Sequence, residues 1–237
     1  MTDRLSQVKQ YHQATKHHFH RYARGPGYMD WSTQPNPFRR YQGAPLIPLD
    51  KVQVTDAPLY DAVFSPGRIP CAPFGFQGIS QLLYDSLALS AWKRAGGEAW
   101  ALRVNPSSGN LHPTEGYLIS PPMESLEGSP LVCHYAPREH ALEVRTRLPL
   151  STWERLLPEG PRDALLVGLA SIHWRESWKY GERAYRYCAL DVGHALGALG
   201  IAAAGLGWRA SLVETMSSGQ LASLLGIGEV KGAETEE

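Results

Sequence analysis

Residues 184–206 limit the choice of fold most strongly, because the second half of this segment is apolar on nearly every side. Positions 195–206 hold only Ala, Leu, Gly and Ile. A helix without a polar face has to be buried, and its small residues allow other backbones to approach closely. We therefore expect a buried central helix, packed under a sheet or across a dimer interface.

Strand patterns accompany that helix. The candidates are residues 99–104, 116–120, 131–135 and 141–145, and a turn at residues 137–140 joins the last two into a hairpin. Residues 164–172 are almost continuously apolar, which is typical of a central strand covered on both faces, and residues 208–213 predict a last strand. Because strands and helices alternate irregularly, the sequence predicts an α+β fold.

Helical patterns occupy three further segments. Residues 4–18 predict a polar helix, and residues 79–91 predict a helix with one buried face that ends before Gly96 and Gly97. Ser217 and Ser218 have the character of caps for a helix that runs to Leu225.

The pattern divides the chain into three parts. In residues 1–75 an N-terminal helix precedes a Pro- and Gly-rich stretch at 25–73, which we expect to wrap over the surface, covering a ligand or a partner subunit, or to be disordered in part. Residues 76–228 form the predicted core. The acidic residues 229–237 predict a mobile tail.

Composition excludes several classes of function. Twenty-three Lys and Arg balance 23 Asp and Glu among 237 residues, so no net charge favours a nucleic acid or an anionic membrane as partner. No apolar run reaches the roughly 18 residues that a membrane-spanning helix needs. The polar N-terminus does not resemble a signal peptide. We expect a cytoplasmic protein with a small-molecule ligand.

The cysteines and histidines indicate neither a disulfide nor a metal site. Cys71, Cys133 and Cys188 are widely separated, and we interpret them as reduced core thiols. The histidines near the N-terminus lack acidic or Cys neighbours that would complete a metal site, so no metal is expected. Motifs for dinucleotides, for nucleoside triphosphates and for serine hydrolases are absent.

The run 103–117 crowds small polar groups between two strand segments. Pro106 ends the first strand, after which Ser107, Ser108 and Gly109 can bring N–H groups and hydroxyls close to a planar or phosphorylated ligand. Asn110 adds a carboxamide that both donates and accepts. The alternative is a plain turn into a helix capped by Ser107 or Ser108, and the spacing alone leaves both open.

This run resembles the Pro-Ser-Ser-x-Asn-x-x-Pro segment of the nitroreductase family of flavoproteins, and most closely its SagB/ThcOx-type (McbC-like) dehydrogenase branch. Residues 178–187, 191–194 and 205–208 are similar to the same branch, so the resemblance covers most of the chain. It implies a nitroreductase-like fold with a mainly antiparallel central sheet flanked by helices. It also implies FMN along Pro106, Ser107, Ser108, Gly109 and Asn110, and a homodimer with FMN sites between subunits.

The resemblance assigns further contacts to the cofactor. Residues 36–41 lie where relatives carry an Arg-rich segment, which implies that Arg39 and Arg40 bind the FMN phosphate through their planar donor forks. Their alternative role is ordinary surface charge. Ser211, in the predicted last strand, is expected to support the ring from its other side. His112 departs from the Gln that classical nitroreductases carry at this place.

Lys179 and Tyr180 are the candidate catalytic pair. In azoline dehydrogenases of the branch, a Lys-Tyr pair has been assigned a role in removing a proton while the flavin takes the hydride. Cationic neighbours such as Arg175 and Arg183 would disfavour the ammonium form of the lysine. The alternative is a solvated lysine and a half-buried tyrosine at a helix start.

The resemblance implies an FMN-dependent oxidoreductase that transfers a hydride at the flavin N5 position, with azoline-like or peptide substrates as in SagB-type dehydrogenation. One alternative is an NAD(P)H-dependent reductase of nitro compounds or quinones. The other is a flavin-free scaffold, or a shortened half of a tandem protein, because residues 11–17 and Asp30-Trp31 resemble the opening of the first half of tandem members.

Overall fold

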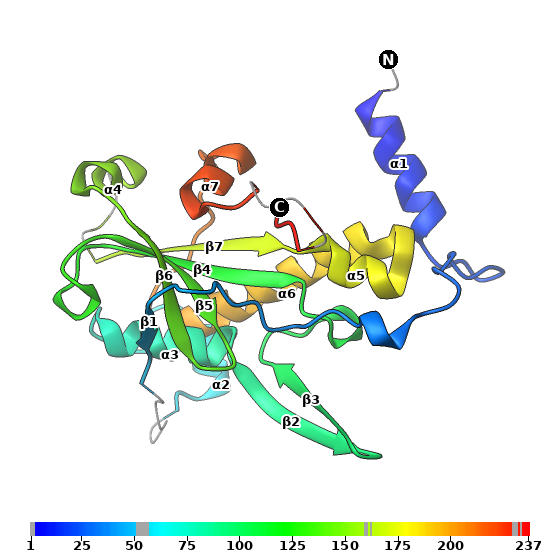
Figure 1. Cartoon of the computed structure of the whole chain (residues 1–237). Coiled ribbons are helices and arrows are strands. Elements are labelled where there is room, and N and C mark those ends of the chain that lie inside the picture. Colours follow the sequence, from blue (N-terminus) through cyan, green and yellow to red (C-terminus); the bar gives the residue numbers. More distant parts are fainter. Residues whose placement is uncertain (1–2, 51–56, 159–160, 162, 229–231, 233) are drawn as a thin grey trace.

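A five-stranded antiparallel sheet forms the centre of the molecule (Figure 1). The computed structural model describes residues 3–50, 57–158, 161, 163–228, 232 and 234–237. The strands of this sheet, in spatial order, are β1 (Leu46–Pro48), β6 (Ala141–Arg147), β5 (Leu131–Ala136), β4 (Thr114–Ser120) and β7 (Leu166–Ser171). The α+β class and the β5–β6 hairpin predicted from the sequence are confirmed.

Helices cover both faces of the sheet (Figure 1). The helices that the structure describes are α1 (Arg4–Thr15), which projects away from the sheet, α2 (Tyr60–Val63), α3 (Phe76–Ser86), α4 (Leu150–Leu156), α5 (His173–Tyr180), α6 (Ala184–Gly205) and α7 (Ser218–Leu225). Short 3₁₀ turns lie at η1 (Trp31–Thr33), η2 (Ser108–Asn110), η3 (Glu124–Leu126) and η4 (Gly181–Arg183). The predicted cap of α7 is confirmed, because Ser217 and Gln220 form a reciprocal capping box.

Alternation along β4 separates two apolar cores. Leu118 packs with Ile79 of α3 and Leu199 of α6 on one face, whereas Tyr117 on the other face packs with Leu225 of α7. Successive residues of a strand point to opposite faces, so a single strand can supply both cores. The sheet therefore holds α3 and α6 on one side and α4 and α7 on the other.

The helix predicted at residues 79–91 is wrong in its second half. α3 ends at Ser86, and Leu89–Ala95 (β2) pairs instead with Glu98–Arg103 (β3) in a hairpin that projects from the body (Figure 1). Gly96 and Gly97 have φ values of +58° and +89°, which is the left-handed conformation of a tight hairpin turn. The two glycines thus turn a hairpin, and do not mark the end of a helix.

Two strand predictions need correction. β7 is a strand, but it lies at the edge of the sheet and not at its centre. Residues 208–213 are irregular and form no strand. The indole N–H of Trp208 donates to Ala72 O (2.9 Å), and the outer edge of β7 pairs with the backbone of Glu237. Ser211 therefore lies in an exposed irregular segment.

α6 forms where the sequence predicts a long helix, but this single chain does not bury it completely. Leu190, Leu196 and Ile201 are exposed, whereas Ala195 and Leu199 face the core. The stretch His173–Gly205 is long and apolar enough to cross a membrane by length and composition alone. Its contacts with α3, β4 and β7 are those of a helix that covers a sheet.

Candidate functional site

The loop between β3 and β4 has an unusual backbone. Gly109, Asn110 and His112 all lie in the left-handed region, with φ values of +61°, +60° and +49°. Residues other than Gly rarely adopt this backbone conformation, and those that do cluster at functional sites. This backbone conformation indicates that the loop belongs to a functional site and does more than connect β3 to β4.

Side chains of the loop hold that backbone in place. The hydroxyl of Ser107 accepts a hydrogen bond from the His112 amide (2.8 Å), and Asn110 Nδ2 donates to Ala101 O (2.8 Å). Asn110 Oδ1 lies 2.9 Å from His112 Nε2. The polar groups of Ser107 and Asn110 are therefore used within the chain, while Pro106 is exposed at the start of the loop.

The structure brings the candidate catalytic pair onto this loop. Lys179 and Tyr180 form the C-terminal end of α5, and a Cβ built on Gly109 would stand 2.6 Å from the Tyr180 hydroxyl and 3.1 Å from Lys179 Nζ. Position 109 can thus approach the pair closely because it lacks a side chain. Two motifs 70 residues apart in sequence meet at one place.

Asp191 of α6 fixes the loop through hydrogen bonds with Ser108. Its carboxylate accepts hydrogen bonds from the Ser108 amide (3.0 Å) and from the Ser108 hydroxyl (2.9 Å), and Asp191 is buried. The helices α5 and α6 pack against each other and against η2. Ser108 is therefore a positioning contact to α6 in this structure.

Glu176 is a buried carboxyl next to these groups. It lies one turn before Lys179 and Tyr180 on α5, and neither of its oxygens has a hydrogen-bond partner among the residues that the structure describes. Burial and the nearby charge of Asp191 raise the pKa of Glu176 to about 9, although Lys179 acts against this. Glu176 is thus a neutral carboxylic acid at neutral pH.

His112 is likewise neutral. Burial, together with the positive charge of Arg103, lowers the pKa of His112 to about 3. Its Nδ1 atom, Asn105 Oδ1 and Thr114 Oγ1 are buried without a partner in the described part of the chain. Unpartnered polar atoms are uncommon in folded proteins, and here two belong to the loop and the third to the first residue of β4.

A buried charge cluster ties the loop to the sheet. Arg175 Nη1 donates to His112 O (2.7 Å) and to Glu115 of β4 (2.6 Å). His134 of β5 lies between Glu115 (3.0 Å) and Glu143 of β6 (2.7 Å). Burial alone would lower the pKa of His134, but hydrogen bonds to the two carboxylates raise it. These alternating positive and negative groups compensate one another out of water.

Arg39 and Arg40 lie in a different environment from the pair on α5. Arg39 Nε is 2.7 Å from Glu236, and Arg40 contacts Glu143 (2.6 Å) and Glu139 (2.8 Å). Both guanidinium groups are therefore neutralised by carboxylates of the same chain. Their assignment to a phosphate stays a prediction, as does that of Ser211, for which no hydrogen bond occurs within the described residues.

The acidic end of the chain is bound where the structure describes it. Glu236 is buried and accepts hydrogen bonds from the hydroxyls of Tyr41 (2.9 Å) and Tyr117, and Glu237 pairs with Ser171 through two backbone hydrogen bonds (2.7 and 3.0 Å). Residues 234–237 thus contact the body of the protein in this structure, and the mobility of the tail stays a prediction. Residues 229–231 and 233 lie outside the described part.

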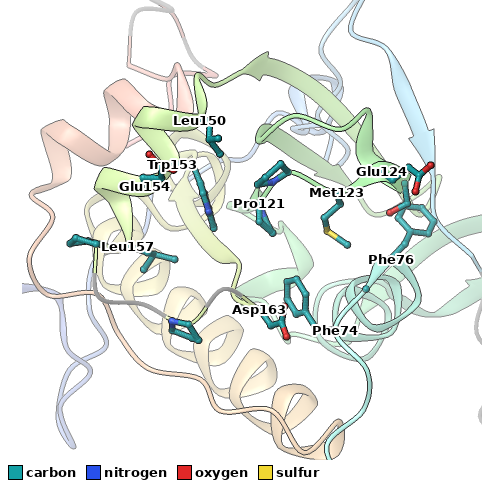
Figure 2. A pocket seen from close by; sticks show the side chains of 15 residues that line it. Phe74, Phe76, Pro121, Met123, Glu124, Leu150, Trp153, Glu154, Leu157 and Asp163 are labelled. Atoms are coloured by element: carbon teal, nitrogen blue, oxygen red, sulfur yellow. The ribbon is translucent and has the colours of Figure 1, made fainter.

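The described surface has cavities beside the candidate pair and beside α4. One of about 430 Å³ is lined by Lys179, Tyr180 and the turn at residues 25–29. A larger one of about 840 Å³ lies between α4 and the start of α3, and Figure 2 shows Met123 and Trp153 among its walls. It shares no lining residue with the first. Only the smaller cavity adjoins the candidate pair.

Several residues of this site carry no sequence signal that identified them. Glu176 could have been found from helical spacing, since residues three and four positions apart share a face, but the α5 helix was not predicted. Asp191 belongs to a segment that carried the resemblance, although no role was assigned to it. Nothing in the local sequence indicates that Glu115, His134 and Glu143 meet, because sheet register decides it.

Comparison with known proteins agrees with this fold. No protein-family model and no curated protein matches the chain. A solved structure of a protein assigned as a nitroreductase, from Anabaena variabilis, has a TM-score of 0.71 and 28% identity, and the match covers 93% of this chain and 43% of that one. The chain thus spans less than half the length of the Anabaena protein.

Two more distant structures share the fold alone. A protein assigned as a nitroreductase from Ralstonia eutropha has a TM-score of 0.57 and 16% identity over 84% of this chain and 88% of that one. The Escherichia coli microcin synthetase complex McbBCD, with truncated pro-MccB17 bound, gives 0.55 and 18% over 98% and 88%.

The chain has the nitroreductase fold, which is that of a family of flavin-type oxidoreductases. The nitroreductase-like fold that the resemblance implied is confirmed, and the McbBCD structure shares this fold.

Proposed function

We propose that the protein is an FMN-dependent oxidoreductase that transfers a hydride at the flavin N5 position. The observation that carries this proposal is the position of Lys179 and Tyr180 directly over Gly109 in the left-handed loop. A pair able to exchange a proton and a loop able to approach a flat ligand closely are what such a reaction needs.

The residues fit a flavin on the ring side. Buried polar atoms of Asn105 and His112 in the loop have no partner within the described residues, and a flavin ring could supply one. On the phosphate side the fit is poorer, because Arg39 and Arg40 already contact carboxylates. Lys179 and Arg183 line the adjoining cavity without such partners among the described residues.

When bound, the flavin would supply the two-electron chemistry. The residues of this chain would move the proton: Lys179 Nζ and the Tyr180 hydroxyl lie at the same side of the loop, so Lys179 in its neutral amine form would take a proton from a substrate held there, and the Tyr180 hydroxyl would relay or donate one. Neutral Glu176 would leave the charge of Lys179 uncompensated. Asp191 would hold the loop against α6 through Ser108.

The substrate and partners are part of the proposal. Azoline-like or peptide substrates follow from the SagB-type resemblance, and NAD(P)H-dependent reduction of nitro compounds or quinones is the alternative within the same chemistry. The exposed apolar side chains of Leu190, Leu196 and Ile201 on α6 support the homodimer that the resemblance implies. A cytoplasmic location stays part of the proposal.

One observation favours a second function, a flavin-free scaffold. The carboxylates of Glu143 and Glu236 neutralise the guanidinium groups that were expected to bind phosphate. A chain that had lost its cofactor would be free to use these groups for stability.

Purification without added cofactor separates the two functions. Visible absorption bands of flavin, with FMN released at about one per chain, support the oxidoreductase, and Lys179→Ala and Tyr180→Phe should then lower turnover while FMN stays bound. A folded, colourless protein that takes up no added FMN supports the scaffold.

A further inference from the structure

The smaller cavity, of about 430 Å³, lies between the turn at residues 25–29 and the end of α5. It is lined by Gly25, Pro26, Gly27, Met29, Lys179, Tyr180 and Arg183. Pockets for small molecules in proteins are typically about 300–1,000 Å³. The cavity therefore has room for one small organic molecule.

The wall opposite α5 is held in place by specific contacts. A Cβ on Gly181 would stand 3.6 Å from Pro26 N, so the turn rests on the end of α5. The indole N–H of Trp178 lies 3.2 Å from Asp30 O and 3.1 Å from Thr33 Oγ1. These contacts define the shape of the cavity without a ligand.

The charged residues of the lining are Lys179 and Arg183, both of them cations. No carboxylate among the described residues lies within ion-pair distance of either, whereas Arg39, Arg40 and Arg175 all contact carboxylates. Two uncompensated positive charges at the wall of one cavity attract an anion.

The guanidinium of Arg183 is fixed in position, but some of its N–H donors have no hydrogen-bond partner among the described residues. Its carbon lies 5.3 Å from the ring centre of Tyr180 and 5.5 Å from that of Tyr187, and Nη1 contacts His17 Nε2 (2.7 Å) and the Tyr187 hydroxyl (3.1 Å). Nε is buried without a partner, and Nη2 makes no hydrogen bond to any described residue. One edge of the donor fork is thus free.

The two cations outnumber the one buried acidic charge that reaches the cavity. Glu176 is neutral at neutral pH, because burial and Asp191 raise its pKa to about 9. Asp191 accepts hydrogen bonds from Ser108, and its negative charge acts on Tyr180 of the lining. Glu182 lies 3.7 Å from Arg24, and both side chains are exposed to water.

We propose that this cavity binds the anionic group, a carboxylate or a phosphate, of a small organic ligand, with Arg183 as its main contact. Arg favours these groups because its planar donors match their oxygens. Gly25 and Gly27 have open space where a Cβ would stand, so the ligand can approach their backbone. The anion comes either from a flavin phosphate or from a substrate, and the site does not depend on the proposed function.

Two matched ligand pairs test the proposal on the full chain. FMN and riboflavin differ by the phosphate, and 4-nitrobenzoate and 4-nitrobenzamide differ by the negative charge. Binding is measured by flavin fluorescence for the first pair and by NMR titration of the flavin-free protein for the second. We expect the anionic member of one pair to bind about tenfold more tightly, as one charge-assisted contact gives.

Variants then locate the site. Arg183→Gln should reduce the preference to about one, Arg183→Lys should keep part of it because it keeps the charge, and Arg68→Gln, at an exposed arginine elsewhere, should leave it unchanged. A preference confined to the flavin pair assigns the anion to the cofactor, and one confined to the benzoate pair assigns it to a substrate.

The proposal is overturned if both pairs bind without preference, if no ligand binds, or if the preference survives Arg183→Gln. Failure of the proposed function gives a different result. In that case neither flavin binds, while 4-nitrobenzoate still binds more tightly than its amide.

Discussion

A Cβ atom on Gly109 would stand 2.6 Å from the hydroxyl oxygen of Tyr180, so the loop and the end of α5 fit together only while position 109 has no side chain. Gly109 also has a φ of +61°, which L residues adopt at a cost of about 1–2 kcal/mol. These two effects can be separated by experiment, because Gly96 has a φ of +58° and open space at its Cβ position.

Gly109→Ala should therefore displace Tyr180, whereas Gly96→Ala should not. Both variants should lose about 1–2 kcal/mol of stability from the backbone conformation, measured by denaturant unfolding. Only Gly109→Ala should shift the NMR signals of the Tyr180 ring. Unshifted Tyr180 signals in that variant would contradict the contact.

Glu176→Gln should remove a pH dependence of stability. Glu176 has a raised pKa of about 9 in the folded protein and an ordinary value of 4.5, so between these pH values the folded state holds a proton that the unfolded state has lost. The stability is fully present below pH 4.5 and falls as pH rises towards 9, by at most about 1.4 kcal/mol per pH unit.

Unfolding measured at several pH values tests this dependence. The Gln variant should show a flatter profile than the wild type, and Glu154→Gln, at an exposed carboxylate, should follow the wild type. Parallel profiles for the wild type and Glu176→Gln would rule out a buried neutral carboxyl.

Glu115→Gln should be strongly destabilising, because it leaves Arg175 and His134 buried with less compensating charge. Breaking a buried ion pair typically costs about 3–5 kcal/mol, whereas Glu127→Gln, which removes an exposed partner of Arg147, should cost at most about 1 kcal/mol. Equal losses, measured by urea unfolding, would show that the buried cluster contributes no more than a surface pair.

The same carboxylate predicts acid sensitivity. Burial would raise the pKa of Glu115, but Arg175 and His134 lower it to about 2. The unfolded chain takes up the proton at its ordinary value of 4.5, so the stability from this group is present above pH 4.5 and is lost as pH falls towards 2. Glu115→Gln should lack this loss.

Glu236→Gln should loosen the end of the chain from β7. The buried carboxylate contacts Arg39, Tyr41 and Tyr117, and the next residue pairs with Ser171. Hydrogen exchange at the Ser171 amide should become about tenfold faster, since one charge-assisted contact is lost. Glu237→Gln removes an exposed carboxylate and should leave the exchange rate unchanged. Identical rates in both variants would contradict the anchoring role of Glu236.

Local patterns predicted much of the fold, and they failed where a distant part of the chain decides the structure. The cap at Ser217 and the hairpin β5–β6 follow from residues close in sequence. Residues 208–213 carry a strand pattern but are irregular in the structure. The backbone of Glu237, from the distant end of the chain, pairs with the outer edge of β7 instead. Leu89–Ala95 could continue α3 by its pattern, yet pairing with β3 prevails.

The sequence predicted part of the candidate site, namely the loop and the pair on α5, but not the carboxylates around them. The resemblance identified the loop and the pair at Lys179 and Tyr180, and the fold brings them together. Carboxylates that neutralise Arg39 and Arg40 come from β6, the turn before it and the end of the chain, so no local pattern could indicate them. Neutral Glu176 depends on burial, which only the packed structure defines.

The central claim is that the left-handed loop and the end of α5 form the ligand site. The most direct test is a titration of isotope-labelled protein with FMN, followed through the backbone amide signals. If FMN binds at this site, the amide signals should shift saturably, with the largest shifts at Ser108–Asn110, Lys179 and Tyr180. No shift, or shifts confined to the larger cavity around Met123 and Trp153, would contradict it.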